Sequence, residues 1–519
     1  MSVVDKIIVS NRQALAAKYG PAGVTAIDAA LARLIAADLA RGHVSRVIEI
    51  DDAGQMAAVG GAPTLGPTDQ RGAKRAVDAI HAKEQPDFLL LLDGPDVIPH
   101  IELNPIAGLG DADPVIDSDL PYACAAPFST SAAAFLAVTR VVGRLPASRG
   151  AASHDAIVAL IDRSISHAPL PAPQGARPFF AISADVWKLS TQLSLSALFG
   201  GYAGLHLAPK ATHTAIDASL ATTSHFINCH GAKADWRFYG EKAGTYPIAM
   251  ESAPTGLNVA DGTIVAAECC YGAELYDHTL GGHPQPICMS YLLNGAVAFM
   301  GATTIAYGPP SSNGQADLIC QYFLEYAMAG ASTGRAMLQA RQRFVATQTM
   351  SGATNLKTLA QFLLYGDPSL VAVAAPVAQP HVMGFAAPVA ASEEALAKDR
   401  RSARKARRVA LESDGEAFAA ASTKPSRKTK TTDETARRLK ELAEANGFTS
   451  EPQVFAVSGG RDYRAAAKRF GRTQKVAVAV ERAQTPAVTE TGAELPSFRV
   501  LVAQILDDGL TRVEVTESR

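Results

Sequence analysis

The sequence is poor in cysteine and tryptophan and carries little net charge. Its 519 residues include six cysteines and two tryptophans, and the formal net charge at pH 7 is -2. So few cysteines in so long a chain exclude a disulfide-stapled scaffold. The near balance of acidic and basic side chains gives no reason to expect nucleic acid or a membrane as the main partner. We therefore expect a partner of neither kind.

Two kinds of apolar segment are also missing. The start of the chain, MSVVDKIIVSNRQALAAKYG, does not have the basic segment and apolar run of a signal peptide. No stretch reaches the roughly 18 uninterrupted apolar residues of a membrane-spanning helix. Because the few thiols are also expected to be reduced, the sequence predicts a soluble protein of the cytoplasm.

Segments with helical and with strand patterns alternate along the first 375 residues. Residues 23–40 have the apolar spacing of a helix, residues 45–50 resemble a strand, and residues 72–83 resemble a second helix. Phe88–Leu92 is a continuous apolar run that ends in Asp-Gly-Pro, as in a strand buried on both faces of a parallel sheet. This alternation predicts an α/β fold, and folds of this class place their sites at the carboxyl edge of the sheet.

Composition and pattern divide the chain into four parts. We expect an N-terminal α/β subdomain over residues 1–168 and a second α/β domain over residues 169–375. An Ala/Pro-rich and basic linker is predicted for residues 376–432, partly helical and exposed to solvent. Residues 433–519 are expected to form a small α+β module.

Two predicted strands end in residues that are suited to acyl transfer. Residues 228–231 read Asn-Cys-His-Gly, and residues 268–272 read Glu-Cys-Cys-Tyr-Gly. A thiolate is the nucleophile in such chemistry, and an imidazole can take the proton of the thiol and pass it to the leaving amine. The glycines allow a substrate backbone to approach, and backbone N–H groups at such turns can hold an oxyanion. His230 and Cys270 are therefore expected to meet at one edge of the sheet.

The order of these motifs resembles that of the caspase-like cysteine peptidases, and the gingipain family (peptidase family C25) is the closest in pattern. GAVAFMGATTIAYG (295–308) and FLLYGDPSL (362–370) resemble the strand after the nucleophile and the closing segment of that family. DFLLLLDGPDVIPH (87–100), DSDLPYA (117–123) and RVVGRLPA (140–147) resemble its N-terminal subdomain. The resemblance covers residues 85–372. It implies a caspase-like parallel-sheet sandwich with helices on both faces, so that residues 169–375 would be the catalytic domain.

The resemblance also assigns roles to residues. It implies a cysteine endopeptidase that works through an acyl-enzyme, with His230 as general base and acid and Cys270 as nucleophile. The backbone N–H groups of Gly231 and Cys270 would form the oxyanion hole. Cys269 stays open as the alternative nucleophile, because the gingipains themselves have Cys-x-x-Gly. Glu268, two residues before Cys270, favours Cys270.

The substrate pocket is less well defined by the sequence. The resemblance implies an acidic side chain before the His strand that binds Arg or Lys. Asp185 lies in that region, although it is equally suited to a helix N-terminus. Asp235 and Trp236 follow the His-Gly pair and are further candidates, although a lone tryptophan is more often part of a core. No cofactor is expected to be required, while the resemblance allows calcium. The expected partners are a peptide or protein substrate and an activating protein.

Two other functions and one regulatory hypothesis remain open. A zinc site could be built from Cys229, His230, Cys269, Cys270, His283 and Cys288, but adjacent cysteines on a strand point to opposite faces. The chain could also be a catalytically silent scaffold or binding protein on a peptidase-like fold. If the enzyme prefers basic residues, it could cut itself in the basic segment 398–430 and release the C-terminal module.

Overall fold

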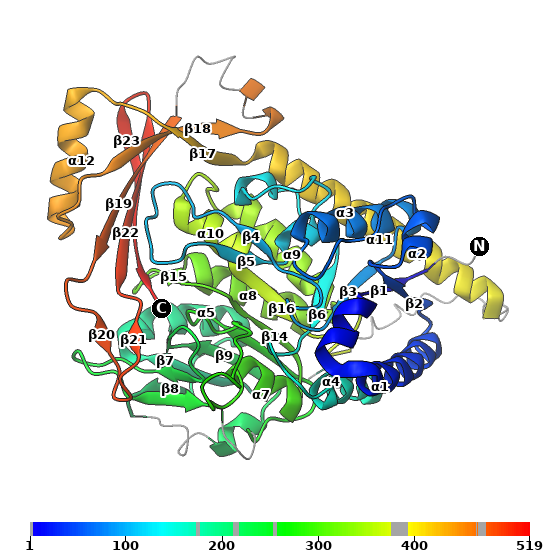
Figure 1. Cartoon of the computed structure of the whole chain (residues 1–519). Helices are drawn as coiled ribbons and strands as arrows, with labels where there is room; N and C mark the ends of the chain where they lie inside the picture. The colour runs from blue at the N-terminus through cyan, green and yellow to red at the C-terminus, as the bar shows by residue number, and fades with distance from the viewer. Residues whose placement is uncertain are drawn as a thin grey trace, which may run out of the picture.

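A ten-stranded, mainly parallel β-sheet runs through the N-terminal three quarters of the chain (Figure 1). The computed structural model describes residues 4–172, 177–210, 217–252, 257–374, 393–462, 464–465 and 474–519. The strand order is β2 (Ser45–Glu49), β1 (Lys6–Ser10), β3 (Phe88–Leu92), β6 (Val142–Leu145), β16 (Phe362–Tyr365), β14 (Ala296–Ala302), β13 (Thr263–Ala267), β9 (Ser224–Asn228), β7 (Phe180–Ala184) and β8 (Leu205–Ala208).

Helices flank this sheet in two rows. One row contains α1 (Arg12–Ala40), α4 (Asp155–Ser166) and α7 (Ile287–Asn294), and the other contains α5 (Lys188–Phe199), α8 (Gln315–Met328), α9 (Thr333–Thr347) and α10 (Ala353–Gln361). The shorter α2 (Ala53–Ala58) and the helix α3 (Gln70–Glu84) connect β2 to β3. The α/β fold expected from the sequence is thereby confirmed, and β3 is buried along its whole length as predicted. Within the described residues, no helix has the length and apolarity needed to cross a bilayer.

The sheet consists of two halves that run in opposite directions. Strands β2, β1, β3, β6 and β16 are parallel to one another, and so are β14, β13, β9, β7 and β8. The halves join where β14 pairs antiparallel with β16. The carboxyl ends of the two halves therefore lie at opposite edges. The neighbours β9 and β13 belong to the same half, so the residues after both strands emerge side by side.

One sheet and one apolar core span the two parts that composition separates at residue 168. The junction of the two halves is made by β16 with β6 on one side and β14 on the other, and these strands come from both parts. A small antiparallel pair of β4 (Ile101–Leu103) and β5 (Ile116–Ser118) lies outside the main sheet. The boundary expected at residue 168 therefore does not coincide with a gap between two cores.

A second sheet is built mainly from the C-terminal part. Its order is β15 (Tyr307–Gly308), β23 (Gly509–Ser518), β22 (Phe498–Leu506), β19 (Gln474–Arg482), β18 (Gln453–Gly459) and β17 (Thr423–Lys428), all antiparallel. Helix α12 (Asp433–Ala445) packs against it with Leu439 and Ala443. β15 comes from the N-terminal three quarters of the chain, so the module is joined to that part by the pairing of β15 with β23.

The predicted linker differs from the structure in two places. Residues 393–421 form the long helix α11 (Glu393–Ala421), which packs on α9; there Gln342 donates a hydrogen bond of 2.5 Å to the carbonyl of Leu411. Thr423–Lys428 is strand β17 of the second sheet rather than connecting chain. Residues 376–392 of the predicted linker lie outside the described residues. The basic segment 398–430 is therefore largely regular structure, although most of its described side chains are exposed or only partly buried.

The closing Gly-Asp-Pro segment has a structural role. Lys6 on β1 is fully buried, and its Nζ lies 2.7 Å from Asp367 and 2.6 Å from Asp38. The Lys6 ammonium holds the pKa of the Asp367 carboxyl below its usual range, in opposition to the effect of burial. One cation therefore serves two buried carboxylates and ties α1 to the end of β16.

We expect Lys6→Ala to lower the free energy of unfolding by about 3–5 kcal/mol, because it leaves buried carboxylates without a counter-charge. Denaturant unfolding followed by circular dichroism measures this loss. Arg33→Ala is the matched control. It removes the Arg33–Asp162 pair, in which both side chains are about half exposed, and should cost less than about 1 kcal/mol. Equal losses in the two variants would contradict the role given to Lys6.

Candidate active site

The ends of β9 and β13 bring His230 and Cys270 to the same edge of the sheet. The two strands pair in parallel with Ile227 opposite Ala267, and the chain then continues into each motif. His230–Gly231 forms the short strand β10, which pairs with β11 (Arg237–Tyr239), and β11 pairs with β12 (Ile248–Glu251). Gly231 is in such close contact with Cys270 that a Cβ at this position would overlap the Cys270 carbonyl oxygen. Glycine is therefore required here, and the His-Gly and Cys segments lie against each other.

In the part of the chain that the structure describes, the imidazole of His230 is hydrogen-bonded through only one of its two nitrogens. Its Nε2 lies 2.6 Å from a carboxylate oxygen of Glu241, and Tyr246 donates a 3.4 Å hydrogen bond to the other oxygen. The ring lies 4.3 Å from that of Trp187 and 5.4 Å, edge on, from that of Tyr246. Within the described residues, the buried Nδ1 has no hydrogen-bond partner. With Nε2–H donating to Glu241, Nδ1 is the basic nitrogen that can accept a proton.

Glu241 was not found by sequence analysis. It lies on the turn between β11 and β12, eleven residues after His230, and no motif marks it. It should act as a positioning residue that fixes the tautomer and orientation of the imidazole.

We expect Glu241→Gln to lower kcat by about 10- to 100-fold with little change in KM, since the amide cannot stabilise the imidazolium that forms on proton transfer. Kinetics on a peptide substrate measures kcat and KM separately. Glu251→Gln, on the neighbouring strand β12, is the control. A variant with unchanged kcat would show that Glu241 is only structural.

The backbone N–H and the thiol of Cys270 both form hydrogen bonds with neighbouring main-chain groups. The N–H donates a 2.9 Å hydrogen bond to a main-chain oxygen of Arg519. The thiol accepts from the N–H of Ala306 at 3.3 Å. Burial raises the pKa of the Cys270 thiol to about 12. The thiol is thus protonated in this arrangement. It needs a base to become a nucleophile.

Cys269 has different surroundings. Its thiol is buried beside Cys229, and both burial and this neighbour raise the pKa of Cys269 well above its usual range. Tyr291 of α7 lies near the same two cysteines. Both cysteines are fully buried, but Cys269 lies beside Cys229, whereas Cys270 lies next to the main chain of Arg519.

The side chain of Arg519 fills a closed polar pocket next to Cys270. The guanidinium has no exposed surface, and it lies 4.9 Å over the ring of Trp187. Its Nη2 donates to both oxygens of Asp317 at 3.0 and 3.1 Å and to the carbonyl of Pro309 at 3.0 Å. Its Nη1 donates to the side-chain oxygen of Asn228 and lies 3.2 Å from Glu268.

The two acids of this pocket have shifted pKa values. Burial and the nearby negative charge of Asp317 raise the pKa of Glu268 well above its usual range. Burial also raises the pKa of Asp317, although the nearby positive charge of Arg519 lowers it. Asp317 lies at the start of α8, where it accepts a hydrogen bond from the N–H of Gly314 at 3.4 Å.

The pocket candidates from sequence analysis lie elsewhere around His230. Asp185 is 3.9 Å from Lys242, and Asp235 accepts hydrogen bonds from Arg237 at 2.9 Å and from Tyr239 at 2.6 Å. Trp236 stacks on His283 at 4.6 Å, beneath the guanidinium of Arg237. These side chains shape the β10–β12 sheet. The tryptophan that faces Arg519 is Trp187, and the acids that do so are Asp317 and Glu268.

No metal centre emerges from the same residues. Across the described ranges, no group of three or more His, Cys, Asp or Glu side chains could hold a metal ion. His283, a member of the imagined zinc set, is stacked on Trp236. Within those ranges the zinc set imagined from the sequence does not assemble, and we derive no step through a metal.

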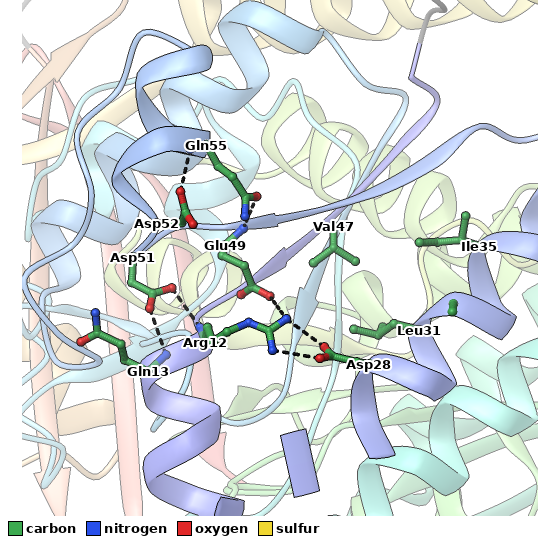
Figure 2. A pocket seen from close by; sticks show the side chains of 11 residues that line it. Arg12, Gln13, Asp28, Leu31, Ile35, Val47, Glu49, Asp51, Asp52 and Gln55 are labelled. Carbon is green, nitrogen blue, oxygen red and sulfur yellow. Dashed lines mark hydrogen bonds and ion pairs between the residues drawn. The ribbon is translucent and has the colours of Figure 1, made fainter. Parts of the chain in front are cut away.

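A separate hollow of about 480 Å³ lies at the carboxyl ends of β1 and β2 (Figure 2). Its charges are already paired within the protein. Arg12 lies between Asp28, at 2.9 Å, and Glu49, at 3.5 Å, as Figure 2 shows. Asp51 accepts hydrogen bonds from the first N–H groups of α1, and Asp52 caps α2. Since the two half-sheets are antiparallel, this hollow lies at the edge opposite to His230 and Cys270.

Comparison with known proteins identifies one family. The family model of peptidase family C25 matches residues 3–373. A solved structure described only as a protease shares 12% identity, with 100% of this chain and 98% of that chain covered and a TM-score of 0.44. The separase of Saccharomyces cerevisiae, solved in complex with securin, shares 13% identity over 44% of this chain and 14% of its own, with a TM-score of 0.28. No curated protein matches.

Proposed function

Because the chain belongs to peptidase family C25, the gingipain family, it is a cysteine peptidase, and we propose that it is an endopeptidase with Cys270 as nucleophile and His230 as general base and acid. One observation carries the assignment of the nucleophile. The backbone N–H of Cys270 holds a carbonyl oxygen of an extended peptide segment at 2.9 Å. A carbonyl held in this way is where an attacking thiolate and an oxyanion donor are both needed.

The proposed reaction begins with proton transfer. Nδ1 of His230 takes the proton of the Cys270 thiol, and the resulting thiolate attacks the carbonyl carbon of the substrate. The negative charge that develops on the carbonyl oxygen is stabilised by the N–H of Cys270, and we propose that the N–H of Gly231 adds to it. The imidazolium then gives its proton to the amine as the C–N bond breaks. Water, deprotonated by His230, hydrolyses the thioester and restores the thiol.

Endopeptidase action is supported by the way in which the cleft takes up an extended chain. Strand β15 pairs antiparallel with a segment that ends at the Cys270 N–H, with Tyr307 opposite Ser518 and Gly308 opposite Glu517. Backbone pairing over residues before the attacked carbonyl is typical of strand addition, which accepts many sequences. An enzyme of this kind reads several residues upstream of the bond that it cuts.

We also propose a peptide or protein substrate and action in the cytoplasm. The support for the location is that all six cysteines are free thiols, as suits a reducing compartment. The catalytically silent scaffold is the second candidate, although the Nδ1 of His230, unpartnered among the residues that the structure describes, and the close packing of Gly231 on Cys270 support catalysis.

A labelling experiment tests the proposed function. The purified protein is incubated with an acyloxymethyl-ketone peptide that carries arginine next to the electrophile, at millimolar concentration so that it competes with Arg519. The expected result is one thioether adduct, located on Cys270 by peptide mapping and lost in His230→Ala. A folded protein that gives no adduct on any cysteine would favour the scaffold.

A further inference from the structure

Strand β23 pairs with β15 and reaches Cys270 as an extended substrate would. β23 extends β15, the N–H of Arg519 donates to the carbonyl of Ala306 at 3.0 Å, and the Arg519 carbonyl accepts from Cys270. The backbone of residues 517–519 is therefore paired up to the position that the attacked carbonyl of a substrate would take.

The pocket around the guanidinium is built for a cation. Asp317 and Glu268 have no exposed surface, and a buried carboxylate is costly without a counter-charge. Ion pairs of Arg519 with Asp317 and Glu268 meet this need. Gly308, on β15, is also matched to the arginine, because a Cβ at this position would overlap the guanidinium. The pocket thus has both the charge and the space for this side chain.

The arrangement distinguishes arginine from lysine. Both terminal nitrogens are used, with Nη1 directed to Asn228 and Nη2 to Asp317 and to the carbonyl of Pro309. A guanidinium has five N–H donors in a planar fork, whereas an ammonium is a point charge on a different stem. Lysine cannot reach these acceptors with the same geometry.

Strand β23, the tail, is also held by contacts away from the Arg519 pocket. β23 pairs with β22 from Leu506–Gly509 to Arg499–Glu517. The hairpin of β20 (Ala487–Val488) and β21 (Glu494–Leu495) packs on the β10–β12 sheet; there Tyr239 shares a 2.7 Å hydrogen bond with Thr491. A strand tethered in this way has an effective concentration on the order of millimolar at its binding site.

We propose that β23 is a built-in inhibitor that occupies the position of a bound substrate beside Cys270, with Arg519 in the pocket of Asp317 and Glu268. The inference rests on the proposed function and adds to it a means of regulation. Cleavage requires the last residues of the chain to leave the cleft. A substrate or partner that draws β23 away from β15 activates the enzyme.

The test compares three forms of the full chain: the wild type, Arg519→Ala, and Arg512→Ala as the control. Arg512 is on the same strand, about half exposed and paired with Glu514. Initial rates are measured on fluorogenic peptides that differ only in arginine, lysine or aspartate at the residue cleaved after. Arg519→Ala should raise kcat/KM on the arginine peptide at least about tenfold, mainly through KM, since it removes a competitor at millimolar effective concentration. Arg512→Ala should match the wild type.

Addition of the tail as a separate peptide gives a second readout. A synthetic peptide of residues 509–519 should inhibit Arg519→Ala competitively, and the same peptide with alanine in place of its final arginine should not. Because Arg519→Ala leaves buried acids unpaired, folding is checked by circular dichroism, and Arg519→Lys, which keeps the charge, should give an intermediate rise in activity.

The outcomes separate the two proposals. Equal rates of wild type and Arg519→Ala on the arginine peptide would overturn the inhibitory role, and a preference of the variant for lysine or aspartate would overturn the pocket assignment, while both would leave the peptidase intact. Folded variants that cleave no peptide and take no label at Cys270 would overturn the proposed function, and the inference with it.

Discussion

Cys270→Ala is expected to reduce kcat/KM by about a thousandfold or more, because the nucleophile of the acyl-enzyme pathway is removed. The measurement is best made in the Arg519→Ala background, where the cleft is free and the starting rate is high. The arginine fluorogenic peptide provides the assay, and circular dichroism shows that the variant is folded. KM should change little, since the pocket for the arginine side chain is intact.

Cys269→Ala is the matched control. The two cysteines are adjacent and both fully buried, but Cys269 lies beside Cys229 in the core. We expect this variant to retain kcat/KM within about threefold and to lose some stability, since a small buried side chain has been shortened. The opposite result, with activity lost in Cys269→Ala and kept in Cys270→Ala, would move the nucleophile to Cys269 and leave the peptidase assignment in place.

Asp317→Asn is expected to lower kcat/KM on the arginine peptide by about 100-fold. The loss of one partner from a buried, hydrogen-bonded charge pair costs about 2–5 kcal/mol, and each 1.4 kcal/mol is a factor of about ten. Asp317 meets the guanidinium with both oxygens. The useful readout is the ratio of kcat/KM for arginine to that for an uncharged residue at the same position. This ratio should collapse in Asp317→Asn.

Asp235→Asn separates the two possible locations of the pocket. Asp235 is the acid that follows the His-Gly pair, and its oxygens are engaged by Arg237 and Tyr239. We expect its replacement to leave the arginine-to-uncharged ratio unchanged, whatever it does to the stability of the β10–β12 sheet. A ratio that falls in Asp235→Asn and not in Asp317→Asn would place substrate recognition on the other side of His230.

The strands were predictable where their patterns are local. Phe88–Leu92 is apolar at every position, so it was recognised as a strand buried on both faces, and the structure has it as β3. The opposite directions of the two half-sheets were not predictable, since the antiparallel pairing of β14 with β16 depends on contacts between distant segments. The same limit applies to Thr423–Lys428, whose basic composition resembles a linker but which pairs with β18.

Some residues of the candidate site could be found from the sequence, and others could not. His230 and Cys270 follow strand ends and carry recognisable chemistry, and the structure brings their segments together. The roles proposed for them await the experiments above. Asp317 looks in sequence like an ordinary acid in the first turn of a helix, where a dipole favours it. Its pairing with Arg519 spans 202 positions of the chain. No local pattern could have indicated that contact.

The strand addition at β15 has a consequence for the physical behaviour of the active form. β15 is the edge strand of the second sheet, and β23 covers its hydrogen-bonding groups. When the tail leaves, an unpaired edge appears beside an acidic pocket that has lost its counter-charge. Open edges are templates for pairing with other chains. If β23 leaves on activation, we expect the active form to self-associate more readily than the inhibited form.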